Sequence, residues 1–226
     1  MILVGVSGPS AAGKSLLCRS LKAVLVECEI LQQDWYYKHP DDLDPVGNYC
    51  DPQWLSWERF VTDVRRLAAG EAIEIEVMDG AFCRTGEIAV VRPGSITLIE
   101  GMTIFRSPEL MEMFDVSLYL DPGLPMLSSR KWHRDRVERG KTDEEIRHQL
   151  RWVEEEYLAD LRLLPSSVRR ICAGRSQERV MREALECIVS TFRRESLLGT
   201  ETRGPANVAF PALRRIPSGV HAEAIR

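Results

Sequence analysis

An α/β fold, with a mainly parallel sheet flanked by helices, is the class that the sequence predicts. Residues 2–6 form a short apolar run, which is typical of a strand buried on both faces. A glycine-rich loop with a phosphate-binding pattern follows at 8–15 and opens a helix. Candidate strands then alternate with candidate helices along most of the 226-residue chain, whose length suits one domain of moderate size.

The composition is that of a folded globular chain and excludes several other classes. Apolar residues make up 44% and charged residues 28%, which rules out a wholly disordered or fibrous chain. The formal net charge is −4, whereas proteins that bind nucleic acid or anionic membranes usually carry an excess of positive charge, so we expect neither partner. We find no signal-peptide pattern, no apolar stretch of about 18 residues and no CxxC pair, which predicts a cytoplasmic protein with reduced cysteines.

Periodicity predicts the elements of the first part of the chain. Apolar positions at helical spacing indicate a helix over 15–26, and a short apolar run indicates a strand over 29–31. Residues 41–52 are rich in Asp, Pro, Gly and Asn and therefore predict a loop. An amphipathic helix with several aromatic residues on its apolar face is expected over 53–69, and Gly70 follows as a stop signal.

A change of period marks the middle of the chain. Alternating apolar and acidic positions over 73–77 indicate a half-exposed strand. Two more strands are expected over 88–91 and 96–99, with residues 92–94 as the turn. This group predicts a small β-hairpin insertion beside the main sheet.

Strands and helices alternate again in the last third. A buried strand is expected over 116–120 and a helix over 124–138. Thr142 and Glu145 have the spacing of a capping box, which opens a further amphipathic helix. A strand over 168–173 and a final helix over 176–194 complete the regular pattern, and the Gly- and Pro-rich residues 196–226 predict a flexible C-terminal tail.

The sharpest chemical signal is the run from Gly8 to Ser15, which matches the phosphate-loop pattern GxxxxGK[ST] at every position. Glycines let the backbone curl so that successive N–H groups point at phosphate oxygens, and the helix N-terminus favours negative charge. Lys14 is expected to reach the β- and γ-phosphates, and Ser15 to ligate Mg²⁺. The sequence therefore predicts ATP and Mg²⁺ as cofactors, with ATP bound by Gly8, Ser10, Ala11, Ala12, Gly13, Lys14, Ser15 and Leu16.

Two acidic residues follow predicted strands, where side chains of a parallel sheet face the ligand crevice. Asp34 follows the second strand, and its carboxylate could accept a hydroxyl proton or contact Mg²⁺ through water; alternatively it is a solvated loop acid. Glu100 ends the strand over 96–99, the position of a Walker-B-type carboxylate that holds Mg²⁺ or orients the nucleophile. An acid at a strand end is common, so the assignment of Glu100 depends on the phosphate loop upstream.

A cluster of cations follows the buried strand over 116–120: Arg130, Lys131, Arg134, Arg136, Arg139 and Lys141. Such a run can be a solvated helical face. Phosphoryl transfer, however, needs cations around the γ-phosphate, and guanidinium geometry suits that role. The break at Arg139-Gly140 suits a mobile lid over residues 124–141.

Several segments in the same order resemble the uridine kinase and phosphoribulokinase-like branch of P-loop kinases, with the nicotinamide riboside kinases within it. The resemblance covers about residues 1–165. Residues 33–38 resemble the QDxFYK segment, residues 48–60 resemble the N-W-D-x-P run before a helix, and residues 99–105 resemble the "EGF…IFN" of riboside kinases. Residues 130–141 resemble the R-x-x-x-RD-x-x-ERGR lid of uridine kinases.

The resemblance implies a role for each matching residue and a P-loop nucleoside kinase-like domain over residues 1–195. Asp34 would be the catalytic base, and the catalytic set would be Asp34, Lys14, Arg130 and Arg134. Ser15 and Glu100 would organise the metal. The substrate-binding residues would be Asp34, Tyr37, Asp51, Asp79, Arg84 and Arg139.

Two departures from the family pattern concern the acceptor substrate. Cys50 stands where the family has an aspartate that binds ribose hydroxyls, and Asp51 comes one residue late, so either the loop shifts by one or this contact is lost. The family's uracil-reading histidine has no counterpart, because Cys83 falls at its position after Asp79. This absence weakens uridine as the substrate, whereas the lid is more like that of the uridine enzymes.

We therefore expect ATP-dependent phosphorylation of the 5′-hydroxyl of a ribonucleoside, with nicotinamide riboside ahead of uridine or cytidine. The alternative is a nucleotide-binding regulatory protein without kinase activity, since such a protein could carry the two departures described above. The sequence leaves the oligomeric state open.

Overall fold

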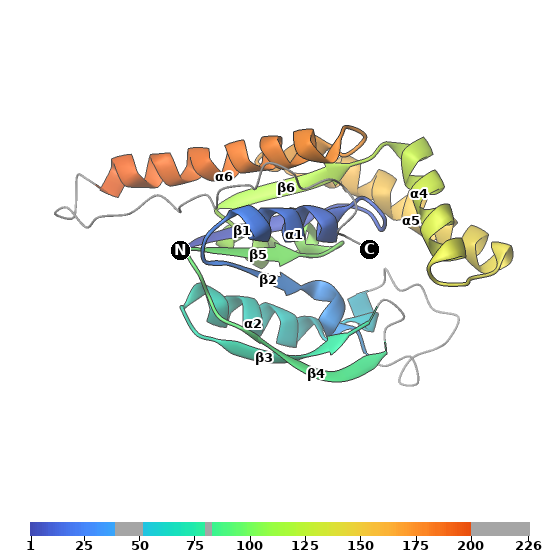
Figure 1. Ribbon diagram of the computed structural model, residues 1–226, viewed down its shortest axis with the longest axis horizontal. Coiled ribbons are helices and arrows are strands. Elements are labelled where there is room, and N and C mark those ends of the chain that lie inside the picture. Colours follow the sequence, from blue (N-terminus) through green and yellow to red (C-terminus); the bar gives the residue numbers. More distant parts are fainter. Residues whose placement is uncertain (39–51, 80–82, 200–226) are drawn as a thin grey trace.

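The computed structural model describes residues 1–38, 52–79 and 83–199, and its centre is a five-stranded sheet (Figure 1). The strand order is β2-β5-β1-β6-β7, and every neighbouring pair is parallel. The fold class that the sequence predicts is confirmed. The strands are β1 (Ile2–Ser7), β2 (Cys28–Gln32), β5 (Ile96–Glu100), β6 (Val116–Asp121) and β7 (Arg169–Cys172).

Helices cover both faces of the sheet because its central strands are apolar on both sides. Alternate residues of β1 point to opposite faces, so Ile2, Val4 and Val6 belong to one core cluster and Leu3 to another. The first cluster is completed by α1 (Lys14–Val24) and α6 (Gln177–Gly199). The second is completed by α2 (Trp57–Ala68) and by the small sheet below it in Figure 1.

The small sheet is the expected hairpin insertion. It pairs β3 (Ile73–Met78) with β4 (Arg84–Val91) in antiparallel register, with Ile75 opposite Ala89. β4 begins at Arg84, four residues before the predicted strand. The prediction missed its first residues because they are exposed and lack the apolar alternation that marks a strand. Residues 92–94 then lead from β4 into β5 of the main sheet.

A third layer of helices extends from one end of the sheet. It contains α4 (Leu124–Val137) and α5 (Asp143–Leu163), which pack on each other, and the short α3 (Pro108–Met113) precedes β6. The expected capping box opens α5: the Thr142 hydroxyl accepts from the Glu145 amide at 3.3 Å, and the Glu145 carboxylate accepts from the Thr142 amide at 2.8 Å. Among the helices that the structure describes, none is long and apolar enough to cross a membrane.

Two helices have boundaries that differ from those expected from the sequence. The helix expected over 53–69 begins at Trp57, because Trp54 lies in a separate 3₁₀ turn, Pro52–Trp54. The final helix, expected over 176–194, continues to Gly199. Most of the loop expected over 41–52 and the tail from 200 lie outside the described residues.

Candidate active site

The phosphate loop connects the end of β1 to the start of α1, as its pattern predicts. Two of its glycines adopt backbone angles that other residues avoid, with φ of +143° at Gly8 and +96° at Gly13. At Gly8 space is limiting as well, because an added Cβ would lie 2.6 Å from the carbonyl oxygen of Leu120. The loop therefore packs directly on β6, and a larger residue at Gly8 would push it away.

Lys14 is the first residue of α1 and directly follows Gly13 of this loop. Its ammonium donates to the carbonyl oxygens of Gly8 and Pro9, both at 3.0 Å. Burial lowers the pKa of Lys14, and the carboxylates of Glu100 and Asp34 oppose this shift. The lysine is thus held where two carboxylates and the curled backbone converge.

Ser15 and Glu100 form the second part of the site. The Ser15 hydroxyl donates to Glu100 Oε1 at 2.6 Å, and the Gln32 amide donates to Oε2 at 3.1 Å. Glu100 ends β5 and is only 6% exposed. Burial raises the pKa of Glu100, while Lys14 and these two hydrogen bonds act in the opposite direction.

The donor set at this point fits Mg²⁺. A hydroxyl and a carboxylate are oxygen ligands of the kind that Mg²⁺ prefers, and the ion usually takes the rest of its shell from water and phosphate oxygens. Within the described parts of the chain there is no group of three or more His, Cys, Asp or Glu residues that would form an all-protein metal site. Ser15 and Glu100 are the residues that would hold the ion.

Asp34 belongs to the 3₁₀ turn Gln33–Tyr36, which directly follows β2. The buried Gln33 fixes this turn to the chain after β5: its amide oxygen accepts from Met102 N at 2.9 Å and from Thr103 N at 3.2 Å. Tyr36 fixes the turn to α2 through a 2.9 Å hydrogen bond to Asp63. These buried contacts hold the turn rigidly and leave the Asp34 side chain exposed at the cavity.

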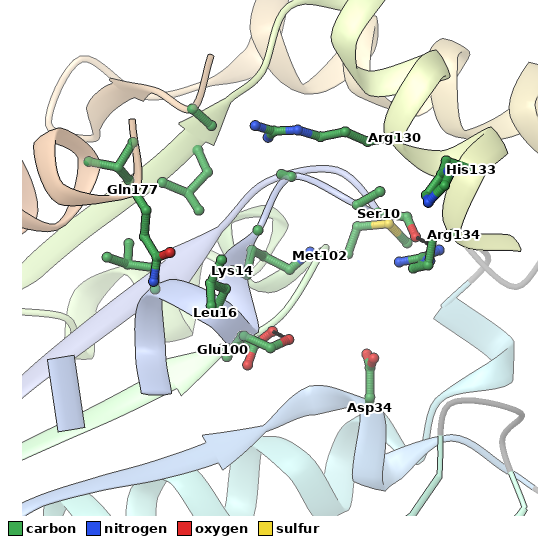
Figure 2. A pocket seen from close by; sticks show the side chains of 18 of the residues that line it. Ser10, Lys14, Leu16, Asp34, Glu100, Met102, Arg130, His133, Arg134 and Gln177 are labelled. Carbon is green, nitrogen blue, oxygen red and sulfur yellow. Dashed lines mark hydrogen bonds between the residues drawn. The ribbon is translucent and has the colours of Figure 1, made fainter. Parts of the chain in front are cut away.

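One cavity of about 760 Å³ brings the predicted residues together (Figure 2). That volume is in the range of small-molecule sites. Asp34 approaches from β2, whereas Arg130 and Arg134 approach from α4 on the other side of the phosphate loop. The expected residues that line the cavity are Ser10, Ala11, Ala12, Gly13, Lys14, Ser15, Leu16, Asp34, Tyr37, Glu100, Arg130, Arg134 and Arg139.

Among the expected site residues that the structure describes, three do not line this cavity. Gly8 packs against the backbone of Leu120 instead of facing the cavity. Asp79 and Arg84 lie at the end of the β3–β4 hairpin, where Asp79 accepts from the Cys83 amide at 2.9 Å and Arg84 forms a 2.7 Å ion pair with Glu76. Asp51, like Cys50, lies outside the described residues.

Sequence reasoning missed the far end of the cavity. Figure 2 shows Gln177 on the opposite side of Lys14 from Asp34. Residues from β6, from the chain after β7 and from the start of α6 line this end: Leu120, Ala173, Arg175, Gln177, Val180 and Met181. The buried members, Leu120, Ala173 and Val180, look like ordinary core residues, and no motif marks the exposed Arg175 and Gln177. Only the packing of α6 against α1 reveals that these residues face a cavity. His133, on α4, is a further lining residue that no motif marked.

Comparison with known proteins assigns the chain to a family. The model of the phosphoribulokinase/uridine kinase family matches residues 3–162. The chain belongs to this family. The resemblance found in the sequence is thereby confirmed, and the phosphate loop, the cavity and the family together identify a nucleotide-binding kinase domain.

Two curated relatives of this P-loop kinase are uridine kinases. The one from Leuconostoc citreum is 30% identical over 171 residues, which are 71% of this chain and 78% of that protein. The one from Shewanella halifaxensis is 29% identical over 159 residues, 66% of this chain and 75% of that protein. A solved structure from Silicibacter sp. TM1040, provisionally described as a fructose transport system kinase, has a TM-score of 0.54 and 23% identity, and the match covers 74% of this chain and 88% of that one. This last likeness supports the fold alone.

Proposed function

We propose that the chain transfers the γ-phosphoryl group of ATP to the 5′-hydroxyl of a ribonucleoside. The observation that carries the proposal is the shared cavity, in which a phosphate loop, the Ser15–Glu100 pair and the exposed Asp34 carboxylate converge. This combination suits a reaction that moves phosphate to an alcohol, because it contains a phosphate-binding end and a separate acid for the hydroxyl.

In the proposed reaction the acceptor oxygen bonds to the γ-phosphorus while the bond to the β-phosphate oxygen breaks, and ADP leaves. Asp34 orients the hydroxyl and takes its proton. Lys14 and the amides of the phosphate loop hold the phosphates, and Arg130 and Arg134 stabilise the transferring group. Ser15 and Glu100 would hold Mg²⁺, which would neutralise phosphate charge. Most of the rate enhancement then comes from positioning and charge stabilisation.

Two lines of support point to different nucleosides. Residues 79–84 contain no histidine that could read a pyrimidine base, which favours nicotinamide riboside. The names of the two curated relatives favour uridine and, by its similar sugar and ring size, cytidine. We place nicotinamide riboside first and uridine or cytidine next.

A panel assay tests the proposal. Purified protein is incubated with ATP and Mg²⁺, and ADP formation is followed with nicotinamide riboside, uridine, cytidine and, as non-nucleoside alcohols, fructose and D-glycerate. Strong stimulation by one ribonucleoside supports the proposal and identifies the acceptor. Stimulation by a non-nucleoside alcohol alone would overturn the ribonucleoside assignment. Measurable ATP binding without turnover on any acceptor would instead support the alternative of a nucleotide-binding regulator.

A further inference from the structure

We propose that Asp135 is a positioning residue, which holds the arginines of the predicted lid over the phosphate loop and is itself charge-balanced by the buried Lys131. The inference deepens the proposed function and rests on it. Near the C-terminal end of α4, the buried carboxylate of Asp135 lies among four cationic side chains.

The centre of this arrangement is withdrawn from solvent. Asp135 is fully buried and Lys131 is 1% exposed, and their 2.5 Å ion pair joins two positions one turn apart on α4. Burial alone would raise the pKa of Asp135, but the hydrogen bond and charge of Lys131, with Arg134, lower it. The carboxylate is therefore ionised at neutral pH.

The two oxygens of Asp135 contact different partners. Oδ2 contacts Lys131 and, at 3.8 Å, Lys141. Oδ1 accepts from both Nε and Nη2 of Arg134, at 3.0 and 2.9 Å, and lies 3.6 Å from Arg139. One oxygen thus faces the buried ammonium. The other fixes the guanidinium of Arg134 and lies near that of Arg139, and both arginines line the cavity.

Arg134 reaches the phosphate loop directly. While its Nε and Nη2 bind Asp135, Nη2 also donates to the Ser10 hydroxyl at 3.0 Å (Figure 2). The double contact to one carboxylate oxygen restricts the rotation of the guanidinium plane, so Asp135 determines where the arginine charge lies relative to the loop. A long, otherwise flexible side chain is in this way pre-oriented for phosphate.

The charge balance of this group leaves positive charge available to a ligand. Asp135 lies among four cations. Lys131 is too buried to contact a ligand in the cavity, but it compensates the charge of Asp135, so the positive charge of Arg134, Arg139 and Lys141, which line the cavity, is not cancelled. The group therefore combines a fixed geometry with an excess of positive charge.

The same group joins three segments of the chain. The backbone N–H of Lys141 donates to the Asp135 carbonyl at 3.0 Å, which folds the turn after α4 back onto the helix. Gln149 of α5 accepts from the Lys141 ammonium at 2.8 Å. Asp135 thereby couples the orientation of the lid arginines to both α4 and α5.

Steady-state kinetics of Asp135→Asn tests the assignment, with Asp143→Asn as a matched control. Asp143, at the start of α5, pairs with the exposed Arg136 and does not line the cavity. Asp143→Asn therefore removes the same charge from the same region. We expect Asp135→Asn to lower kcat by about tenfold or more while the acceptor KM stays within about twofold. Asp143→Asn should leave both values unchanged. An equal loss in the two variants would overturn the proposal.

A double-mutant cycle separates positioning from general structural damage. If Asp135 acts mainly through Arg134, then Asp135→Asn added to Arg134→Ala should lower kcat by no more than about twofold further. Full multiplicative loss would contradict the proposal. Because a lone buried charge destabilises, the variant Lys131→Met/Asp135→Leu removes both charges together and should retain the melting temperature while kcat still falls. Wild-type kcat in this folded double variant would likewise overturn the inference.

Failure of the proposed function is distinguishable from failure of this inference. If the wild-type chain phosphorylates no acceptor, the proposed function fails, and the affinity for a non-hydrolysable ATP analogue becomes the measured quantity. Asp135→Asn and Arg134→Ala should then weaken binding of the analogue, and the two effects should not add. Unchanged affinity in Asp135→Asn, or additive losses, would refute the positioning role independently of the reaction.

Discussion

Lys14 places a positive charge where the phosphate loop, Glu100 and Asp34 meet, so its replacement is the most direct single-residue change at the ATP end. Lys14→Ala removes a contact to the transferring phosphate and should lower kcat by about 10²-fold or more. Its ammonium donates to the loop carbonyls of Gly8 and Pro9 and does not fill the core, so the fold should survive. Kinetics at saturating acceptor, with circular dichroism as the folding control, check this. Near-normal kcat in a folded variant would refute the ATP-site assignment.

Asp34 gives the complementary prediction at the acceptor end. Asp34→Asn keeps the shape and the hydrogen-bonding capacity of the side chain but removes the base, so phosphoryl transfer should fall by about 10²-fold or more. ATP affinity should barely change, because the turn that carries Asp34 is held by other residues. Rapid-quench kinetics and ATP titration measure the two quantities separately. If ATP binding is lost while turnover persists, Asp34 is a nucleotide or metal ligand instead.

Single residues differ in how far the sequence alone could place them. Lys14, Ser15 and Glu100 were predictable because a contiguous motif and a strand end determine their positions, and the structure brings Ser15 and Glu100 to 2.6 Å. His133 and Met181 line the same cavity without any motif. These two residues reach the cavity because helices that are distant in the sequence pack together, and a local sequence pattern contains no information about such packing.

Among the elements, the end of β6 carries a pH-dependent contact to α5 and β7. Asp121 accepts hydrogen bonds from Tyr157, from Arg170 at 2.5 Å and from the Gly123 amide at 3.1 Å. Burial alone would raise the pKa of Asp121, but these three donors lower it below the usual 3.8. A carboxylate whose pKa is depressed by folding stabilises the protein above its unfolded pKa, and this contribution disappears as pH falls through the folded pKa.

Asp121→Asn should therefore lower the melting temperature at pH 7, where the wild-type carboxylate is ionised. Below pH 3.8 the difference between variant and wild type should shrink, because the wild-type group also becomes neutral. Thermal unfolding from pH 7 to pH 3 measures both curves. Parallel curves over the whole range would show that the ionised form of Asp121 contributes no stability.

A second contact between elements joins the 3₁₀ turn Ile104–Arg106 to α5. Arg106 donates to Asp160 Oδ1 from Nε at 2.9 Å and from Nη2 at 2.7 Å, and Asp160 is only 8% exposed. Arg106→Ala leaves this buried carboxylate without its charged partner, which should destabilise the fold by about 1–3 kcal/mol. For a chain of this size, each kcal/mol lowers the melting temperature by about 2–4 °C.

Arg182→Ala is the matched control for that change. Arg182 pairs with Glu178 on the outer face of α6, where the two side chains are 66% and 75% exposed, so its removal should change stability by less than about 0.5 kcal/mol. Equal melting temperatures for the two variants would contradict the role given to Arg106.

Elements were predicted best where the periodicity is long and unambiguous. The capping box of α5 and the apolar run of β1 place those elements closely. The start of α2 was misplaced because Trp54 continues the apolar spacing of the helix, although the chain there forms a separate turn. The six-residue α3 was missed because so short a segment shows too little periodicity.

At the scale of the whole molecule, the strand order brings the predicted site residues together at the carboxyl ends of the strands. β5 pairs with both β1 and β2, so the phosphate loop after β1, Glu100 at the end of β5 and Asp34 after β2 meet at the carboxyl ends of the strands. The parallel class follows from the sequence, but this order does not, because it depends on pairing between distant segments. Residues of α4 complete the cavity, and this helix places Arg134 against Ser10 of the phosphate loop.

The central claim is that this arrangement moves the γ-phosphoryl group of ATP to a ribonucleoside. Its most direct test is a transfer experiment with ATP labelled in the γ-phosphate, in which wild-type protein, Mg²⁺ and each nucleoside of the panel are mixed and the products are separated. The account predicts that the label appears in the 5′-monophosphate of one nucleoside, and that Asp34→Asn greatly slows this transfer. Label that remains in ATP, or that appears only in inorganic phosphate with every nucleoside, would contradict it.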